Sequence, residues 1–268
     1  MHPVLTRHSL VSEALDIHPQ EIVALSGAGG KTSLMFQLAR ELQARRPVLT
    51  TTTTKIAIPD PSQSPCYILT RDDPKWELHC RTRLHELKHV TLAHHCHGGT
   101  QLKGHEGEEM EELLRRDLAP YVLIEADGAR QKPLKAPRHD EPLIPRQSTL
   151  VVGLIGWDIL GKELSELNVH RADILRRTLE LEEIPTWVTG EIIARWVAHP
   201  AGLGKNVPPG ARFVAFLNKC DLEESREEAV RLARNIVCAP RSPCRQVVVG
   251  SLRQGIYISI YLRLKRPR

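Results

Sequence analysis

The sequence predicts an α/β fold of three layers, in which helices cover both faces of a mainly parallel sheet. Three observations support this prediction. Short apolar runs alternate with segments of helical periodicity along most of the 268 residues. A glycine-rich turn joins the first apolar run to the first long helix. Further polar motifs follow later runs, at the strand ends where parallel sheets bind ligands. With an apolar fraction of 41%, we expect one domain over residues 1–268, with an irregular insertion at about 129–148.

The predicted strands are short runs of apolar or β-branched residues that stop at glycine, proline or polar residues. In chain order they cover residues 22–25, 48–53, 66–70, 88–96, 121–126, 149–155, 213–217 and 246–250. The stretch 256–264 could form a terminal strand or a helix. Prolines, glycines and histidines mark the loops, which are expected at 59–65, 96–107, 131–147 and 202–210.

The predicted helices fill the intervals between strands. They cover residues 10–17, 32–45, 73–87, 108–118, 171–181, 191–198 and 224–237. In the second of these, Leu34, Leu38 and Leu42 recur at helical spacing. Asp73 followed by Pro74 is a typical start for the third. The fourth is amphipathic.

Residues 27–32 read GAGGKT and lie between the first strand and the second helix, which is the context of a P-loop. Glycines bring backbone N–H groups close to phosphate oxygens, and the helix N-terminus adds the positive end of its dipole. Lys31 is placed to reach the β- and γ-phosphates, and the Thr32 hydroxyl to bind Mg²⁺. The candidate nucleotide-binding residues here are Gly27, Ala28, Gly29, Gly30, Lys31, Thr32 and Ser33.

The spacing of this loop departs from the usual G-x-x-x-x-G-K-[ST], because Leu25 occupies the place of the first glycine. Similar short loops occur in Mur-type ligases and in the SIMIBI group of nucleotide-binding proteins. The alternative is an ordinary glycine turn before a helix. We favour the P-loop, since strand, glycines, Lys-Thr pair and helix all agree.

Acidic residues follow the apolar run 121–124, which continues as EADG. Mg²⁺ prefers hard oxygen ligands, so a carboxylate is expected here beside a nucleotide. Glu125 and Asp127 compete for this role and are both candidate catalytic and metal-binding residues. The alternative is a strand that ends in an Asp-Gly turn. Thr52 is a candidate switch-like metal ligand, although threonines also simply favour strands.

The run 213–221 ends in N-K-C-D after an apolar strand and resembles the guanine-specificity motif of GTPases. The carboxylate of Asp221 can accept hydrogen bonds from N1–H and N2–H₂ of guanine, a donor pair that adenine lacks. Asn218 would support the loop, and the stem of Lys219 would cover the base. These three residues are further candidates for nucleotide binding, with GTP preferred over ATP.

Composition limits the classes of function and the compartment. The net charge of +5 suggests an anionic ligand or partner, and the 4% of aromatic residues argues against a nucleic-acid stacking platform. The basic tail is expected to be a solvated terminus rather than a nucleic-acid arm. No apolar segment reads as a signal peptide or a membrane span. The six cysteines show no C-x-x-C spacing, so we expect reduced thiols and a cytoplasmic protein.

Taken together, the segments GAGGKTSLM, TTTTKIAIP, IEADGARQKPLKAPRHDEPLIP, VHR and FLNKCD resemble the selenium-dependent molybdenum hydroxylase accessory family (YqeC), a P-loop NTPase-like family. The resemblance covers about residues 12–252. It implies a role in maturing the selenium-containing molybdenum cofactor of molybdenum hydroxylases. Possible partners are therefore the molybdopterin cofactor, a selenium donor or a hydroxylase.

Basic residues of the irregular segment could hold an anionic second substrate, such as a pterin phosphate or a selenophosphate. The candidates from the segment itself are Arg130, Lys132, Lys135 and Arg138. Positions that match the family pattern add Lys55, His170 and Arg171. The alternative is a proline-rich loop whose charged side chains are simply solvated.

The run His94-His95-Cys96-His97 has metal-binding side chains, but only two would share each face of a strand, whereas zinc needs about four. We therefore favour a polar strand end that enters a loop. Cys220, inside N-K-C-D, could carry a persulfide or selenide, but its spacing does not single it out, and we expect each cysteine to be structural.

Three functions are compatible with these motifs. The favoured one is a Mg²⁺-dependent NTPase, with GTP preferred, that drives a step of cofactor maturation. The second is a nucleotide-gated chaperone or scaffold with little turnover, suggested by the short loop and the lack of a clear catalytic Gln or Arg. The third is a kinase or ligase that acts on a pterin cofactor or selenium donor.

Overall fold

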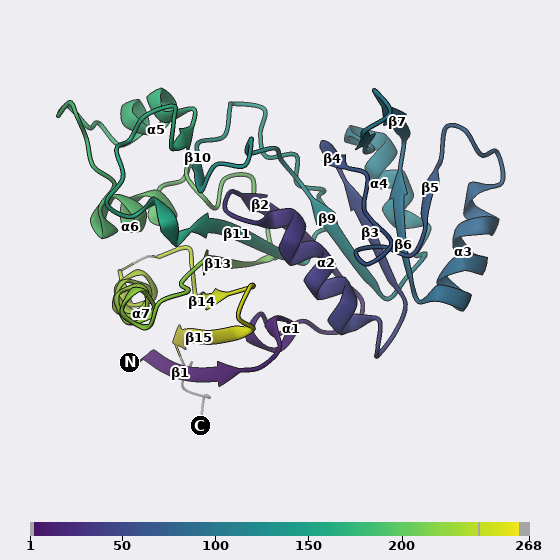
Figure 1. Cartoon of the computed structure of the whole chain (residues 1–268), viewed down its shortest axis with the longest axis horizontal. Coiled ribbons are helices and arrows are strands. Elements are labelled where there is room, and N and C mark those ends of the chain that lie inside the picture. The colour runs from purple at the N-terminus through teal and green to yellow at the C-terminus, as the bar shows by residue number, and fades with distance from the viewer. Residues whose placement is uncertain (1–2, 241, 263–268) are drawn as a thin grey trace.

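The computed structural model of the protein describes residues 3–240 and 242–262 and is built on a ten-stranded sheet (Figure 1). Across the sheet the strands follow in the order β1 (Pro3–His8), β15 (Ile256–Leu262), β14 (Gln246–Ser251), β13 (Arg212–Asn218), β11 (Leu150–Gly156), β2 (Glu21–Gly27), β9 (Tyr121–Glu125), β3 (Val48–Thr52), β6 (His89–Ala93) and β5 (Tyr67–Leu69). β15 runs antiparallel to both of its neighbours, and all other neighbouring pairs are parallel. The predicted α/β class with a mainly parallel sheet is therefore confirmed.

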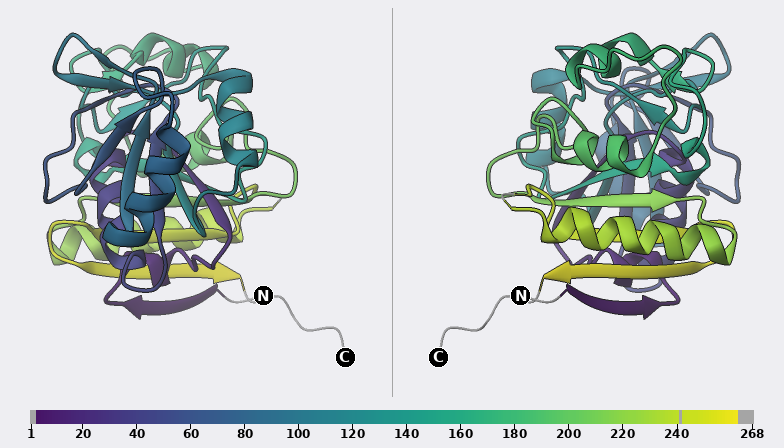
Figure 2. Two further views of the ribbon diagram at one scale, coloured as in Figure 1. Left: turned by 90° about the vertical axis from the view of Figure 1, so that its right-hand side faces the viewer. Right: turned by 90° about the vertical axis from the view of Figure 1, so that its left-hand side faces the viewer.

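Helices cover both faces of this sheet (Figure 2). They are α1 (Val11–Ala14), α2 (Lys31–Leu42), α3 (Trp76–Leu87), α4 (Gly107–Arg115), α5 (Ala172–Thr178), α6 (Gly190–Ala198) and α7 (Glu223–Cys238), with a short 3₁₀ turn at Trp157–Ile159. Successive side chains of a strand point to opposite faces. Val23 and Leu25 of β2 accordingly pack with Leu34 of α2, whereas Ala24 shares a core cluster with Trp196 of α6.

Two small sheets accompany the large one. β4 (Lys55–Ala57), β8 (Gln101–Lys103) and β7 (His95–His97) form an antiparallel sheet of three strands. β10 (Leu134–Lys135) pairs in parallel with β12 (Val169–His170). This second pairing brings the irregular segment against the residues just before α5, two stretches that are more than thirty residues apart in sequence.

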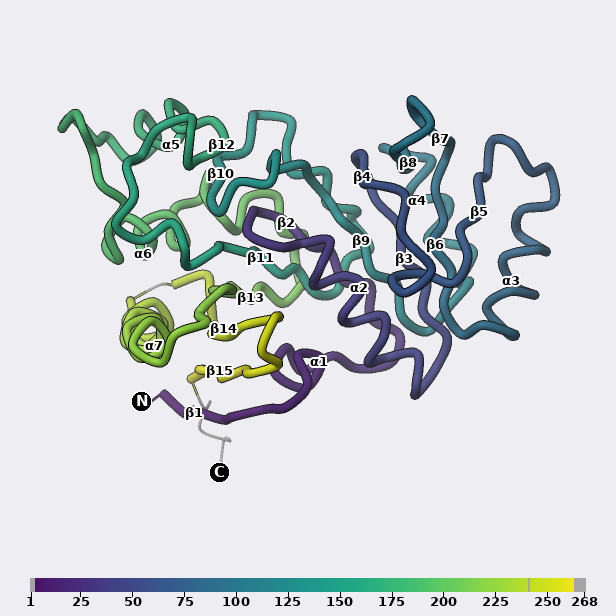
Figure 3. Tube along the Cα trace, in the orientation of Figure 1, coloured from purple at the N-terminus to yellow at the C-terminus, as the bar shows by residue number. Residues whose placement is uncertain are grey.

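The structure corrects several expected boundaries. β1 was not predicted, and it lies beside β15 at one edge of the sheet (Figure 3). The stretch 96–107 is not a plain loop, because it contains the last residues of β7 and all of β8. The helix expected at 10–17 is confined to α1, and the stretch that could be strand or helix forms β15. The basic tail at 263–268 lies outside the described residues.

The sheet topology brings the sequence motifs together at the carboxyl ends of four neighbouring strands. β2, β9, β11 and β13 are adjacent and parallel, so their carboxyl ends meet. In the register, Leu25 pairs with Glu125, and Gly156 pairs with Asn218. Within residues 3–240 and 242–262, no helix is both long and apolar enough to cross a membrane.

Candidate functional site

The turn between β2 and α2 can be made only with glycine. Gly27, Gly29 and Gly30 have φ angles of +87°, +87° and +122°, a region that residues with a Cβ rarely adopt. A Cβ on Gly29 would lie 2.2 Å from the main-chain nitrogen of Gly156. A Cβ on Gly30 would lie 2.8 Å from Nδ2 of Asn218. The loop is therefore packed tightly between the ends of the neighbouring strands.

Hydrogen bonds fix the first half of this loop. The Gly27 amide donates to Oδ2 of Asp127 at 3.2 Å, and the Ala28 amide donates to the oxygen of Leu154 at 2.9 Å. The Gly29 amide donates to the oxygen of Lys132 at 3.2 Å. The first four N–H groups of a helix have no acceptor within that helix. The capacity of this loop to bind an anion therefore lies at the start of α2.

Lys31 is the first residue of α2, and its side chain turns back under the loop. Its Nζ donates to the oxygen of Gly27 at 2.7 Å and lies 3.2 Å from Oδ1 of Asp127 and 3.9 Å from Oε1 of Glu125. Only 5% of Lys31 is exposed. The structure thus brings together the lysine and both acidic residues that were singled out from the sequence, and the protein itself satisfies the ammonium group.

A hydroxyl and a carboxylate lie side by side next to this lysine. Thr32 Oγ1 donates to Oε2 of Glu125 at 2.6 Å. Burial raises the pKa of Glu125, and the charge of Lys31 and the Thr32 hydrogen bond oppose that shift. Thr52 Oγ1 instead donates to the main-chain oxygen of Glu125 at 2.8 Å, so it supports the strand end.

The donor set at Thr32 and Glu125 fits Mg²⁺, which takes hard oxygen ligands and keeps several waters. Asp127 fits it less well, because its carboxylate lies between the ammonium groups of Lys31 and Lys135. Among the described residues, no group of three or more His, Cys, Asp or Glu side chains converges as a metal site. A magnesium ion here would therefore depend on Thr32, Glu125, water and ligand oxygens.

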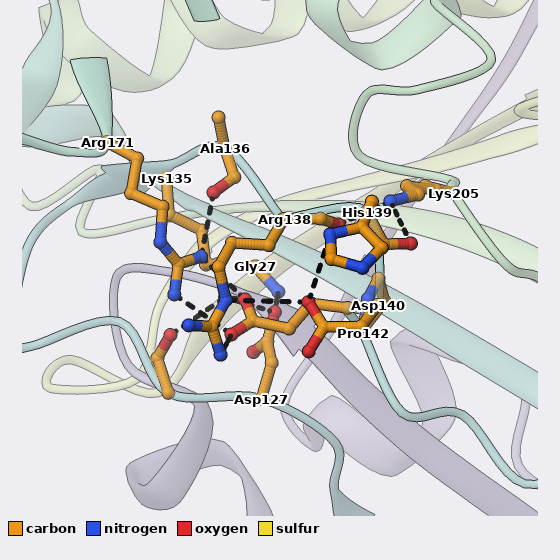
Figure 4. Close-up of polar contacts among 12 residues, drawn as sticks. Gly27, Asp127, Lys135, Ala136, Arg138, His139, Asp140, Pro142, Arg171 and Lys205 are labelled. Atoms are coloured by element: carbon orange, nitrogen blue, oxygen red, sulfur yellow. Dashed lines mark hydrogen bonds and ion pairs between the residues drawn. The ribbon is translucent and has the colours of Figure 1, made fainter. Parts of the chain in front are cut away.

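A chain of ion pairs, buried at Asp127 and Lys135 and half-buried at Arg171, runs from the end of β9 into the irregular segment (Figure 4). Lys135 Nζ lies 2.9 Å from Oδ2 of Asp127 and 2.9 Å from Oε2 of Glu141, and it donates to the oxygen of Gly128 at 2.8 Å. Arg171 forms a bidentate pair with Glu141 at 2.6 and 2.9 Å. Such forked pairs fix geometry as well as charge. Glu141 therefore links the segment 129–148 to the start of α5.

This network changes the interpretation of the basic residues as a substrate clamp. Lys135 and Arg171 are committed to protein carboxylates. Lys132 donates to the oxygen of Leu167, and Lys55 contacts Nε2 of His97 at 2.8 Å, on the small β4–β8–β7 sheet. The basic side chains are thus largely used to hold the segment in place.

Arg130 and His170 remain as side chains that could meet a ligand near this network. Arg130 is exposed and has a φ of +47°. Burial lowers the pKa of His170 to about 4, and the nearby charges of Arg171, Lys135 and Arg130 add to this effect. His170 is therefore neutral at pH 7 in a positively charged environment.

The N-K-C-D motif contacts the glycine loop directly. Asn218 Nδ2 donates to the oxygen of Gly29 at 2.8 Å, so this side chain ties the motif to the glycine loop. Its Oδ1 accepts from the Leu252 amide at 3.1 Å. Asp221 Oδ1 accepts from Ser251 Oγ at 2.6 Å. Lys219 Nζ lies 3.0 Å from Oδ2 of Asp158 and so turns toward the residues after β11.

Ser251 and Leu252 were not identified from the sequence. Ser251 is the last residue of β14, the strand next to β13, and Leu252 follows it; they hold Asp221 and Asn218 of the N-K-C-D motif. The signal available in the sequence was their place at the end of an apolar run, beside the predicted strand end of the motif. Glu141 was likewise noted only as part of the family pattern.

The histidine run forms an aromatic and hydrogen-bonded cluster. His94 and His95 share a contact of 2.9 Å between their Nδ1 atoms. His105 joins it, with ring centroids 5.7 Å from His94, and Thr70 lies 2.8 Å from its Nε2. The run does not enter a loop at Cys96 as expected, because His95–His97 form strand β7.

All six cysteines are free thiols. Burial raises the pKa values of the thiols of Cys80, Cys220 and Cys244 to about 12. These groups are therefore protonated at neutral pH and poor nucleophiles. Cys96 and Cys238 are exposed.

Comparisons with known proteins agree on one family. The family described as "YqeC protein" matches residues 23–173. The uncharacterized protein YqeC of Escherichia coli strain K12 is 37% identical over 201 residues, which cover 74% of this chain and 75% of the relative. No solved structure matches the chain. The matched region contains the glycine loop, both acidic residues and the Glu141 network, whereas the N-K-C-D motif lies beyond residue 173.

Proposed function

The chain belongs to the YqeC family, and from this premise we propose that it is a P-loop nucleotide-binding protein that hydrolyses a nucleoside triphosphate with Mg²⁺, preferring GTP. The single observation that carries the proposal is the meeting of three separate motifs at one loop. Lys31 lies 3.2 Å from Asp127, Thr32 lies 2.6 Å from Glu125, and Asn218 lies 2.8 Å from the oxygen of Gly29.

The chemistry would follow from these side chains. Lys31 would turn from its protein acceptors to the β- and γ-phosphate oxygens, where an ammonium group offsets the charge that develops during phosphoryl transfer. Thr32 and Glu125 would hold Mg²⁺, which neutralises charge on the phosphates. Asp127 would keep Lys31 positioned and could orient the attacking water. The first amides of α2 would cradle the phosphates.

The preference for GTP rests on the surroundings of Asp221. Ser251 donates to only one of its two carboxylate oxygens, so the group keeps lone pairs for N1–H and N2–H₂ of guanine. The link between Asn218 and Gly29 ties this base-binding motif to the phosphate loop. ATP remains the alternative nucleotide.

The biological step proposed is the one that the family resemblance implies. Hydrolysis would assist maturation of the selenium-containing molybdenum cofactor in the cytoplasm, with the molybdopterin cofactor, a selenium donor or a molybdenum hydroxylase as partner. Arg130 and His170, which lie near the acidic strand end, are the candidates to meet an anionic group of such a partner.

A second candidate, the nucleotide-gated scaffold, is favoured by the position of Lys31. Its Nζ already has three protein oxygens within 4 Å, and the side chain is 5% exposed. A phosphate would have to displace these contacts, so nucleotide binding would reorganise the Asp127 and Glu141 network. Such a protein could signal its nucleotide state with little turnover.

Measurement of phosphate release distinguishes these functions. We expect Mg²⁺-dependent release from GTP by the wild-type protein and a loss of roughly 10²–10³-fold in Lys31→Ala. Lys162→Ala, which removes an exposed lysine, is the control and should keep full activity. Equal release by all three proteins would sink the hydrolase proposal. Nucleotide binding without release would favour the scaffold.

A further inference from the structure

A small cavity lies beneath the glycine loop and collects unsatisfied polar atoms. It is lined by Ser26, Gly27, Asp127, Lys135, Trp196 and a few apolar residues. Ser26 Oγ and Trp196 Nε1 are buried and have no hydrogen-bond partner among the described residues, whereas Asp127 Oδ1 lies 3.2 Å from Lys31 Nζ. The exposed fractions of Ser26, Trp196 and Asp127 are 1%, 0% and 4%. Buried polar atoms without partners are rare, and two at one cavity call for an explanation.

The fold places the three residues around the same space. Ala24 packs in the same core cluster as Trp196, and Ser26 shares its face of β2 because side chains alternate along a strand. Trp196 comes from α6, and the chain after that helix returns with Leu203, whose amide bonds to the oxygen of Trp196. A Cβ on Gly27 would lie 3.0 Å from Cδ1 of Leu203, so α6 and its following loop support the phosphate loop.

The volume of the cavity and the charged groups around it favour a water molecule as its occupant. Its volume of about 10 Å³ is close to the room that one water molecule needs. A cation is disfavoured, because the cationic Lys135 and Trp196, whose indole nitrogen can only donate, both line the space. An anion is disfavoured by the carboxylate of Asp127. A water can accept from the indole and donate to the carboxylate, with Ser26 as a third partner.

We propose that one water molecule is a fixed part of this site, bound by Trp196 Nε1–H, Asp127 Oδ1 and Ser26 Oγ. Its role is to hold Asp127 when Lys31 leaves it for a phosphate. Asp127 then keeps the Gly27 amide, the Lys135 ammonium and the water, so its buried charge stays compensated. This role rests on the nucleotide binding proposed above, whereas the water site itself does not.

A high-resolution crystal structure of the wild-type protein without nucleotide tests the water site. We expect one density peak at about 2.7–3.2 Å from all three atoms. In solution, the indole N–H of Trp196, assigned by its loss in Trp196→Phe, should show a magnetisation transfer from a long-lived water. Trp157→Phe, another buried tryptophan that does not line this cavity, leaves that signal in place. The proposal would be overturned if the three side chains were well ordered but no water peak lay between them, or if the indole N–H donated to a protein acceptor.

Matched serine variants test the coupling to the nucleotide. Ser26→Ala should weaken Mg–GTP binding at least about threefold, because the water loses one of its partners. Ser12→Ala removes an equally buried, equally unpartnered hydroxyl in α1, away from the cavity, and should leave the affinity unchanged. Equal effects of the two variants would refute the coupling. If the wild-type protein binds no nucleotide, both the coupling and the proposed function are rejected. The electron density still tests whether the water molecule is bound.

Discussion

Asn218 Nδ2 donates a hydrogen bond of 2.8 Å to the main-chain oxygen of Gly29, a residue 189 positions earlier in the chain. The amide of Leu252 completes the contact by donating to Oδ1 of Asn218. The conformation of the glycine loop therefore depends on β13 and on the turn after β14, as well as on its own glycines.

Replacement of Asn218 tests this dependence. Asn218→Ala leaves the buried oxygen of Gly29 and the amide of Leu252 without partners, so we expect it to lower the free energy of unfolding by about 1–3 kcal/mol. Urea denaturation measures the effect. Asn168→Ala breaks a similar amide-to-carbonyl bond at an exposed position and should change the same quantity by less than about 0.5 kcal/mol. Similar losses in both variants would show that Asn218 does not support the loop.

The stability of the Glu141 network should depend on pH. Burial alone would raise the pKa of Glu141, but hydrogen bonds from Arg171 and Lys135 outweigh it and lower the pKa to about 2 from 4.5. The ionised carboxyl therefore stabilises the folded state above pH 4.5, by roughly 1–3 kcal/mol once solvent screening of the partly exposed pair is included, and this stabilisation is lost as the pH falls toward 2.

Urea denaturation of wild-type protein and Glu141→Gln over a range of pH isolates this contribution. The difference in unfolding free energy should be large at neutral pH and should shrink steadily below pH 4.5. Glu224→Gln, at an exposed position on α7, should give a smaller difference at neutral pH than Glu141→Gln. A constant difference for Glu141→Gln would contradict the lowered pKa.

Asp221 should set the choice of base. Asp221→Asn exchanges an acceptor for a donor, so it should weaken GTP binding at least about tenfold and improve binding of xanthosine triphosphate, whose ring carries an oxygen in place of the amino group. Competition binding with the two nucleotides measures the switch. Asp173→Asn, on the exposed face of α5, is the control. An unchanged preference for GTP in Asp221→Asn would show that Asp221 does not bind the base.

The cysteines should differ widely in reactivity. With pKa values raised by burial to about 12, Cys80, Cys220 and Cys244 should resist alkylation in the folded protein at pH 8. Cys96 and Cys238 are exposed and should react first. Timed alkylation with peptide mass spectrometry gives the order, and unfolded protein is the control in which all six react. Rapid labelling of Cys220 in the folded protein would contradict this order and support the alternative that Cys220 carries sulfur or selenium.

The sequence predicted the fold well where hydrophobic pattern and neighbouring turns decide the structure. The strands around residues 22–25 and 121–126 and the helix that begins near Thr32 were placed correctly within a few residues. β1 was missed, because as an edge strand it is only partly buried. β8 was missed because its three residues, Gln101–Lys103, are held by backbone pairing that leaves no pattern in so short a segment.

The candidate site could be predicted in part for the same reason. The loop residues and the acidic pair are contiguous motifs, and their chemistry follows from spacing. The contact of Ser251 with Asp221 and the cavity shared by Trp196 and Asp127 involve residues that are distant in sequence, so only the tertiary structure reveals them. Lys135 forms ion pairs with Asp127 and Glu141, and this role could not be predicted from a sequence motif.

Calorimetric titration with a non-hydrolysable GTP analogue and Mg²⁺ tests the nucleotide site most directly. The account predicts saturable binding at one site of the wild-type protein and a loss of at least about 100-fold in affinity for Lys31→Ala, with Lys162→Ala unchanged. Absence of binding by the folded wild-type protein, or equal affinity in Lys31→Ala, would contradict it.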